Sequence, residues 1–171
     1  MNARQAPGFA AIAAATLSLA APAAAEPLLL GVFAGTLPCA DCSGIATELT
    51  LVRRDSGWAE GRYLLKQTYI GRAVAPRVTT GEWTTLRGDA ADDNASVYEL
   101  DPDSPDRAQH FLVDGPRRVR ALDRDLKPWP KGLPSILVRR TRGLPTPAAV
   151  NCLRRGGLPG AAGACAKAPA G

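Results

Sequence analysis

Two cysteines separated by two residues, Cys39 and Cys42, have the clearest chemical potential in this sequence; they lie in the segment LPCADCSGI (37–45). Thiols at this spacing can form a short disulfide, exchange electrons as a redox pair, or bind a metal ion. A thioredoxin-type catalyst needs a helix directly after the second cysteine, because the helix dipole favours the thiolate. Here an alternating, strand-like segment follows Cys42, so a loop disulfide and a metal site are the better interpretations.

The metal interpretation favours copper over zinc. Zinc takes four ligands in a tetrahedron, whereas the chain offers one histidine, His110, and two further cysteines, Cys152 and Cys165, that are not spaced as a zinc knuckle. Cu(I) is a soft ion that two thiolates can hold, and Asp41 adds negative charge between them. We therefore predict that no cofactor is required, and that Cu(I) is the ion that the pair suits. The disulfide and metal-bound states exclude each other but can interconvert.

The first 25 residues indicate export. Arg4 precedes the apolar run FAAIAAATLSLA (9–20), and the segment ends in three alanines before Glu26. This pattern predicts a signal peptide cleaved between Ala25 and Glu26, and the run is too short for a membrane span of roughly 20 residues. With no lipidation cysteine after that site and no transmembrane helix, we expect a soluble periplasmic or secreted protein.

An oxidising compartment favours disulfides. From the spacing we predict two local pairs, Cys39–Cys42 and Cys152–Cys165. The net charge of +5 arises from the C-terminal region, since residues 139–171 carry six basic side chains and no acidic one. Nucleic acid would be the natural partner of such a basic segment, but the export signal argues against it.

The elements that must position these residues are short strands separated by turns. Alternation of apolar and polar residues, as in IATELTLVR (45–53), is the period of a half-buried strand. Eight candidates follow at short spacing: 28–36, 45–53, 58–70, 78–86, 96–100, 107–113, 117–123 and 135–140. The pattern predicts an all-β antiparallel barrel or sandwich. We divide the chain into a signal peptide (1–25), a β-domain (26–142) and a loosely ordered basic tail rich in glycine, proline and alanine (143–171).

Other chemical sites have ordinary explanations. His110, which a Ser-His-Asp triad would need, is expected to be a strand residue. An acidic cluster reads as a solvated turn because it lacks the glycine and distal glutamate of a calcium loop; its members are Asp89, Asp92 and Asp93. Four aromatic residues are predicted to belong to the barrel core: Trp58, Tyr63, Tyr69 and Trp83.

The segment GTLPCADCSGIATELTL (35–51) resembles the signature of the NlpE N-terminal domain family. Compatible stretches are YLLKQTYIG (63–71), GEW (81–83), VYEL (97–100) and LDRDLKP (122–128). The resemblance implies an antiparallel, lipocalin-like β-barrel with the cysteine pair in the loop after the first strand. It also implies the role of outer-membrane lipoproteins that report surface contact, metal or misfolding stress to a membrane sensor kinase of the Cpx pathway.

The sequence departs from the family pattern in three respects. It has no lipidation cysteine, no second oligonucleotide-binding-like domain is expected after the barrel, and Leu126 stands where a turn would accommodate glycine. We predict a non-enzymatic periplasmic protein with a role in copper resistance or the envelope-stress response, whose partner is a copper ion or an envelope-stress sensor. The alternative is a lipocalin-like carrier that binds a small apolar ligand in the barrel lumen.

Overall fold

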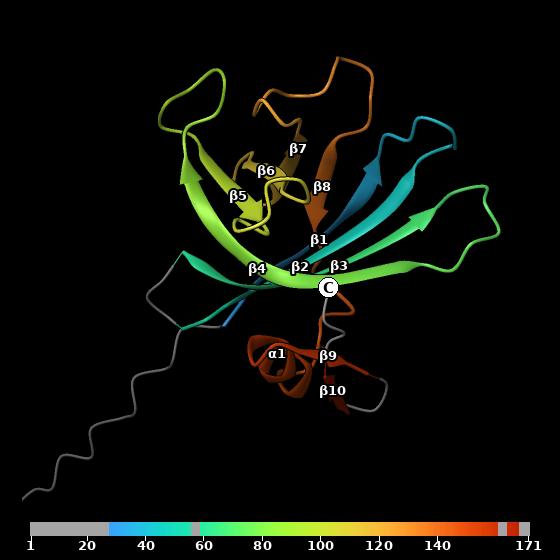
Figure 1. Ribbon diagram of the computed structural model, residues 1–171, viewed down its shortest axis with the longest axis vertical. Helices are drawn as coiled ribbons and strands as arrows, with labels where there is room; N and C mark the ends of the chain where they lie inside the picture. Colours follow the sequence, from blue (N-terminus) through green and yellow to red (C-terminus); the bar gives the residue numbers. More distant parts are fainter. Residues whose placement is uncertain (1–27, 56–58, 161–163, 168–171) are drawn as a thin grey trace, which may run out of the picture.

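The fold is a closed barrel of eight antiparallel strands, followed by a short helix and a two-stranded hairpin (Figure 1). The computed structural model describes residues 28–55, 59–160 and 164–167. The barrel strands are β1 (Leu29–Leu37), β2 (Ile45–Arg53), β3 (Glu60–Tyr69), β4 (Arg77–Arg87), β5 (Ser96–Leu100), β6 (Gln109–Val113), β7 (Arg118–Leu122) and β8 (Ile136–Arg139). Each strand pairs with the next one in the chain, and β1 pairs with β8 to close the barrel.

The structure confirms the all-β barrel and all eight predicted strands, which begin and end within two residues of the predicted bounds. The alternation in β2 has the expected meaning, because Leu49 and Leu51 are fully buried in the barrel interior. They lie opposite Leu65 and Tyr63 of β3 in the antiparallel register. The period-2 pattern therefore predicted both the strand and its inward face.

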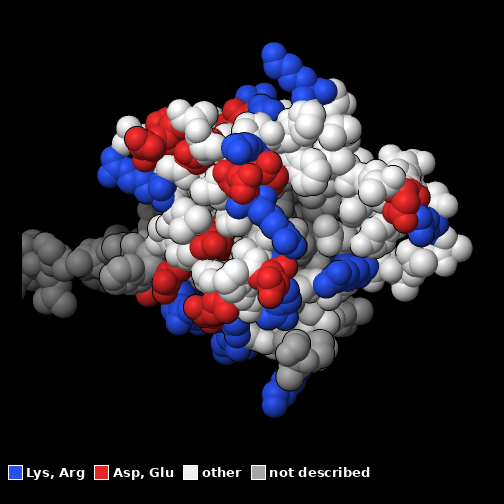
Figure 2. Space-filling model, turned by 45° about the horizontal axis from the view of Figure 1, so that its top comes forward, with Lys and Arg blue, Asp and Glu red and all other residues white. Residues whose placement is uncertain are grey.

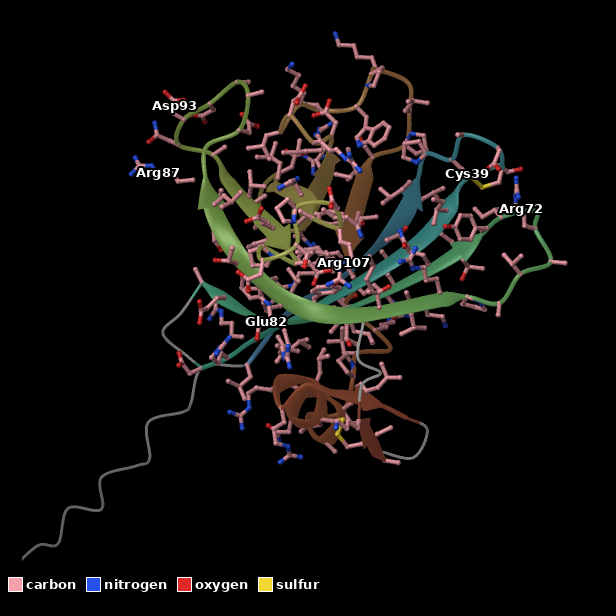
Figure 3. The ribbon with its side chains drawn as sticks, in the orientation of Figure 1. Cys39, Arg72, Glu82, Arg87, Asp93 and Arg107 are labelled. Carbon is pink, nitrogen blue, oxygen red and sulfur yellow. A yellow bond between two sulfur atoms is a disulfide. The ribbon has the colours of Figure 1, made fainter. Side chains whose placement is uncertain are left out.

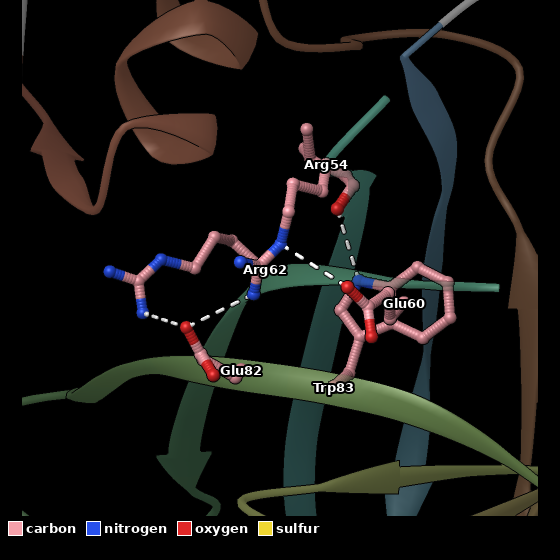
Figure 4. A network of polar contacts seen from close by, with 6 residues as sticks. Arg54, Glu60, Arg62, Glu82 and Trp83 are labelled. Carbon is pink, nitrogen blue, oxygen red and sulfur yellow. Dashed lines mark hydrogen bonds and ion pairs between the residues drawn. The ribbon is translucent and has the colours of Figure 1, made fainter. Parts of the chain in front are cut away.

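Aromatic and aliphatic side chains fill the barrel interior. Within the described part of the chain, Trp83, Tyr63 and Phe111 are its largest fully buried side chains. The indole of Trp83 stacks edge-on against Tyr98, with ring centroids 5.4 Å apart, and its Nε1 donates to the backbone carbonyl of Val52 at 3.1 Å (Figure 4). The prediction of core positions is thus right for Tyr63 and Trp83, whereas Tyr69 is only half-buried. Trp58 lies outside the described residues.

The C-terminal region is ordered where the structure describes it, so the expectation of a loosely ordered tail is wrong there. Helix α1 (Pro147–Arg154) is followed by β9 (Gly157–Pro159), which pairs with β10 (Cys165–Lys167). Thr146 caps the helix by accepting a hydrogen bond from the amide of Ala149 at 3.3 Å, and Pro147 occupies a favoured first position. A cap, rather than long periodicity, accounts for a helix of eight residues.

The tail covers the outer face of the barrel. Val150 and Leu153, three residues apart on one face of α1, are buried against Val52 and Leu64. In Figure 1 the helix and hairpin lie below the barrel, outside the sheet formed by β1 to β4. β2 is consequently buried on both faces along part of its length, which explains why Val52 is fully buried although it points away from the barrel interior.

Among the residues that the structure describes, two other than glycine adopt a positive φ in turns, Asp101 at 53° and Leu126 at 58°. The second value confirms that Leu126 occupies a position that glycine would suit. The acidic turn behaves as expected, because Asp89 Oδ1 accepts hydrogen bonds from the amides of Ala91 and Asp92, both at 2.8 Å. Its carboxylate is thereby used to shape the loop.

The predicted signal peptide and its cleavage site, Ala25 and Glu26, lie outside the described residues. Within the described ranges, no helix has the length and apolar character needed to cross a membrane.

Figure 2 shows basic and acidic side chains interspersed on the visible face of the barrel, beside a broad uncharged area.

Candidate functional site

The cysteine pair lies in the loop between β1 and β2 (38–44), as the family resemblance implies. A disulfide joins Cys39 to Cys42, with their Cα atoms 5.3 Å apart. Gly44 lets the chain enter β2, because its φ of 144° is one that side chains other than glycine rarely adopt. Its carbonyl accepts a hydrogen bond from the amide of Ile70 at 2.9 Å, which ties this loop to the loop between β3 and β4 (70–76).

The pair has oxygen atoms close to both sulfurs. The Sγ of Cys39 lies 3.5 Å from Asp41 Oδ1, and the Sγ of Cys42 lies 3.2 Å from the carbonyl of Gly44. These are contacts and not hydrogen bonds, because a disulfide sulfur carries no hydrogen. The potential ligand atoms of Cys39, Asp41 and Cys42 all lie within 4.8 Å of one another, and no other such cluster occurs in the part of the chain that the structure describes.

Arg72 reaches this loop from the β3–β4 loop (Figure 3). Its guanidinium donates to the backbone carbonyl of Asp41 at 2.7 Å and forms an ion pair with Asp41 Oδ2 at 2.5 Å. The Asp41 side chain is 70% exposed, so this pair contributes little to stability; it orients the loop. Sequence reasoning missed Arg72, although antiparallel pairing of β1 to β4 places both loops at one end of the barrel.

A pocket of about 380 Å³ opens beside the cysteine loop. Leu37 and Pro38, which immediately precede Cys39, form one wall, and Trp129 from the loop between β7 and β8 forms part of another. His110 also lines the pocket, and its Nε2 lies 3.3 Å from Glu99 Oε1. His110 is therefore a strand residue of β6, as expected, but one with a carboxylate neighbour.

The second disulfide joins Cys152 of α1 to Cys165 of β10, with their Cα atoms 5.5 Å apart. Cys152 is 1% exposed and packs within the tail. This pair binds the helix to the hairpin, and it lies on the outer face of the barrel, away from the cluster at Cys39. The structure therefore separates the four cysteines into one pair near a surface loop and one that fastens the tail.

Tyr63 has a perturbed environment inside the barrel. Its hydroxyl donates to Asp101 Oδ2 at 2.9 Å, and burial, followed by this hydrogen bond and the charge of Asp101, raises the pKa of Tyr63 well above its ordinary range. Gly81 makes the contact possible, because a Cβ at this position would collide with the Asp101 carboxylate and the Tyr63 ring. The GEW motif (81–83) thus combines a glycine needed for close approach with the buried Trp83.

We expect this tyrosine to make the protein sensitive to alkali. An unfolded tyrosine ionises near pH 10, whereas the folded state keeps Tyr63 neutral, so stability is intact below pH 10 and declines above it. The unfolding free energy should fall by about 1.4 kcal/mol per pH unit in this range because of Tyr63. Urea unfolding at pH 8 and pH 11 should show a smaller loss in Tyr63→Phe than in wild type, while Tyr69→Phe should resemble wild type. Equal losses in all three proteins would contradict the assignment.

The fold and this loop together define a class of protein: an up-and-down β-barrel that presents a disulfide-closed C-x-x-C loop at one end. The model of the NlpE N-terminal domain matches residues 33–131, more than half of the chain. The chain therefore belongs to the NlpE N-terminal domain family. A search of curated proteins finds no match.

The solved structures similar to this chain include the following two. A protein described as a lipoprotein from Shewanella oneidensis is 26% identical, with 67% of this chain and 89% of that chain covered and a TM-score of 0.44. The Cpx pathway activator NlpE from Escherichia coli is 23% identical, with 60% of this chain and 47% of that chain covered and a TM-score of 0.40.

Proposed function

We propose that this chain is a non-enzymatic periplasmic sensor domain whose Cys39–Cys42 pair responds to thiol redox state and to Cu(I). One observation carries the proposal: two sulfurs and the carboxylate of Asp41 converge within 4.8 Å on a surface loop. Membership of the NlpE N-terminal domain family supports a role in the bacterial envelope. The cleaved signal peptide (1–25) and the division into a barrel (26–142) and a tail (143–171) belong to the same proposal.

The residues present suit a copper ion. Two thiolates three positions apart provide a soft, low-coordinate site, which matches Cu(I) better than zinc, since zinc would lack a fourth protein ligand. Asp41 can contribute its carboxylate or the negative charge alone. Because Arg72 already binds that carboxylate, coordination by Asp41 would require release of the ion pair, while the Arg72 bond to the Asp41 carbonyl could still hold the loop.

The two states are linked by an ordinary redox step. A dithiol reductant transfers two electrons and two protons to the Cys39–Cys42 disulfide and itself becomes a disulfide. Cu(I) then binds as the two thiols lose their protons, so binding is pH-dependent. The loop therefore reports two conditions, a reducing environment and available copper, because metal can bind only after reduction.

The proposed output is an envelope-stress signal. The Escherichia coli protein similar to this chain is described as an activator of the Cpx pathway, and the partner proposed here is likewise an envelope-stress sensor. Copper resistance is the accompanying role suggested by the donor set. Neither role needs a catalytic residue, and the chain is proposed to act by binding.

We expect the reduced protein to bind one Cu(I) through the loop thiolates. Competition with a chromophoric Cu(I) chelator should show that Cys39→Ser/Cys42→Ser lowers the affinity for Cu(I) by more than about 100-fold. This exceeds the loss of about 10- to 100-fold that is usual when a residue supporting a metal ligand is replaced. Asp41→Asn should cost less, because the soft sulfurs remain. Added zinc should displace little copper.

The second cysteine pair supplies the matched control. Cys152→Ser/Cys165→Ser also removes two thiols, yet it should retain one Cu(I) with wild-type affinity. Equal affinity in the wild type and the Cys39→Ser/Cys42→Ser variant, or no binding by either, would refute the metal role and leave the loop disulfide as a structural crosslink.

A small apolar ligand is the second candidate, favoured by the pocket beside the loop. Its volume of about 380 Å³ lies in the range of small-molecule sites, roughly 300–1,000 Å³. The deeper interior is filled by core side chains such as Phe111 and Trp83, so such a ligand would bind at this end of the barrel rather than throughout its lumen. It would lie beside Trp129, whose fluorescence would report binding.

A further inference from the structure

Half of strand β4 lacks a partner on one edge. Residues 77–84 pair with β3 on one side, but pairing with β5 on the other begins only at Trp83, opposite Leu100. Along β4 before Glu82, the structure shows no ladder on this second edge within the described residues. In Figure 1 this half of β4 runs along the front of the barrel, with the loop between β5 and β6 (101–108) above its middle.

Two residues end the β4–β5 ladder. The amide of Asp101 donates to the Glu82 carbonyl at 2.8 Å, and Asp101 then turns the chain with its φ of 53°. Pro102 follows, and proline has no amide hydrogen with which to continue the ladder. The hydrogen bond that the Tyr63 hydroxyl donates to the Asp101 carboxylate holds this turn in place, so the interruption of the ladder is part of the barrel's structure.

The orientation of the free backbone groups follows from the register. The carbonyl of Glu82 points toward Asp101, where it accepts a hydrogen bond. Along an antiparallel strand, the backbone amide and carbonyl of one residue point to one edge and those of the next residue point to the other edge. The amide and carbonyl groups of Val78 and Thr80 therefore point to the unpaired edge of β4, whereas those of Thr79 and Gly81 point to β3. An extended segment of another chain could bind these four groups as an added strand.

A groove of about 510 Å³ runs along this edge and carries arginine side chains. Arg77 and Arg107 both line it, and neither forms an ion pair within the described residues, whereas Arg62 is bound to Glu82 at 3.4 Å (Figure 4). Figure 3 places Arg107 above the middle of β4 and Glu82 below it. Three acids also line the groove: Glu82 pairs with Arg62, Asp101 accepts a hydrogen bond from Tyr63, and Asp103 lies on the exposed β5–β6 loop.

We propose that the free edge of β4 at Val78 and Thr80 binds an extended peptide segment of another protein, with an acidic side chain placed at Arg77 and Arg107. The two guanidinium groups, which form no ion pair within the described residues, favour this occupant, because an acidic side chain of the added strand would pair with them. The site is separate from the cysteine loop, and it stands whether or not that loop binds copper.

The test uses the full mature chain and a fluorescein-labelled probe peptide, Val-Thr-Glu-Thr-Val, followed by fluorescence anisotropy. Two matched peptides isolate the two parts of the proposal. N-methylation at alternate residues blocks the backbone bonds of one edge and should weaken binding at least about tenfold. Replacing the glutamate by lysine should weaken binding about fivefold, the upper range for exposed ion pairs.

Neighbouring threonines provide a matched pair of protein variants. Thr80→Pro removes an amide that faces the gap, so the variant should keep its thermal stability and lose peptide binding. Thr79→Pro removes an amide that faces β3 and should lower the melting temperature. Should Thr80→Pro fail to fold, Arg77→Ala and Arg107→Ala, each expected to weaken binding about fivefold, test the same groove.

Equal binding of the N-methylated and unmodified peptides would overturn strand addition. Equal binding of the glutamate and lysine peptides would overturn the choice of an acidic partner. A monomer–dimer equilibrium abolished by Thr80→Pro in sedimentation would show that a second copy occupies the edge, and would also overturn the proposal.

Discussion

Replacement of Trp83 by alanine should lower the free energy of unfolding by about 3–5 kcal/mol, the range for a large buried aromatic side chain. Trp83 is 2% exposed, stacks against Tyr98, and donates to the carbonyl of Val52. The substitution would therefore leave a cavity in the barrel and a buried carbonyl without its partner, and both effects destabilise the folded state.

Urea unfolding followed by circular dichroism measures this effect. Trp129→Ala is the matched control, because Trp129 is 40% exposed, and exposed positions usually change stability by less than about 0.5 kcal/mol. Similar losses in both variants would mean that Trp83 is not the centre of the core. The ion pairs outside the barrel near Trp83, which join Arg54 and Arg62 to Glu82 (Figure 4), are partly exposed and should contribute much less.

Leu153→Ala should lower the free energy of unfolding by about 2–4 kcal/mol, although Leu153 lies outside the barrel. Its side chain is 2% exposed and packs with Val150 against Val52 and Leu64. The outer face of β2 would then lose part of its cover. Leu144→Ala, at a residue 45% exposed, is the control and should change the thermal melt little.

The melt of Leu153→Ala also distinguishes two descriptions of the tail. A single transition at a lower temperature would show that helix and barrel unfold together. An unchanged main transition would show that α1 detaches on its own and that the barrel is stable without it, as the division at residue 142 assumes.

The sequence predicted an element best where a single hydrophobic period extends over the whole of it. The apolar residues Ile45, Leu49 and Leu51 of β2 share one face of the strand, so its bounds and inward face could be predicted, whereas the burial of Val52 on the outer face could not. Helix α1 could not be found by periodicity, because eight residues span little more than two turns. Its signals were local: Thr146 and Pro147 at its start, and Gly156 after its end, with a φ of 79°.

The candidate site likewise contains residues that could be predicted from the sequence and residues that could not. Spacing and the family motif located Cys39 and Cys42, since both lie within one short loop. Arg72 could not be predicted as their neighbour, because its contact with Asp41 joins residues 31 positions apart and depends on how two loops meet. The interrupted ladder at Asp101 was equally hidden, although Pro102 was a signal that pairing would stop there.

The pairing of β1 with β8, the seam at which the barrel closes, has a consequence for the order of folding. Only two residue pairs join these strands, Phe33 with Arg139 and Ala34 with Val138, and the partners are 106 and 104 positions apart. Contacts so distant in sequence form late, because closing a long loop lowers the chain entropy before the new contacts can stabilise it. The hairpins from β1 to β8 can assemble earlier, one after another, from neighbouring segments.

Until the seam closes, the outer edges of β1 and β8 are exposed, and such edges promote association between chains. The segment after β8 crosses this seam: the amide of Arg140 donates to the Val32 carbonyl at 2.7 Å, and Pro145 and Val150 line a small cavity with Val32. The tail thus adds contacts beside the pairing of β1 with β8 that closes the barrel. A nascent or truncated chain lacking α1 should therefore spend longer as an aggregation-prone, open sheet than the complete protein does.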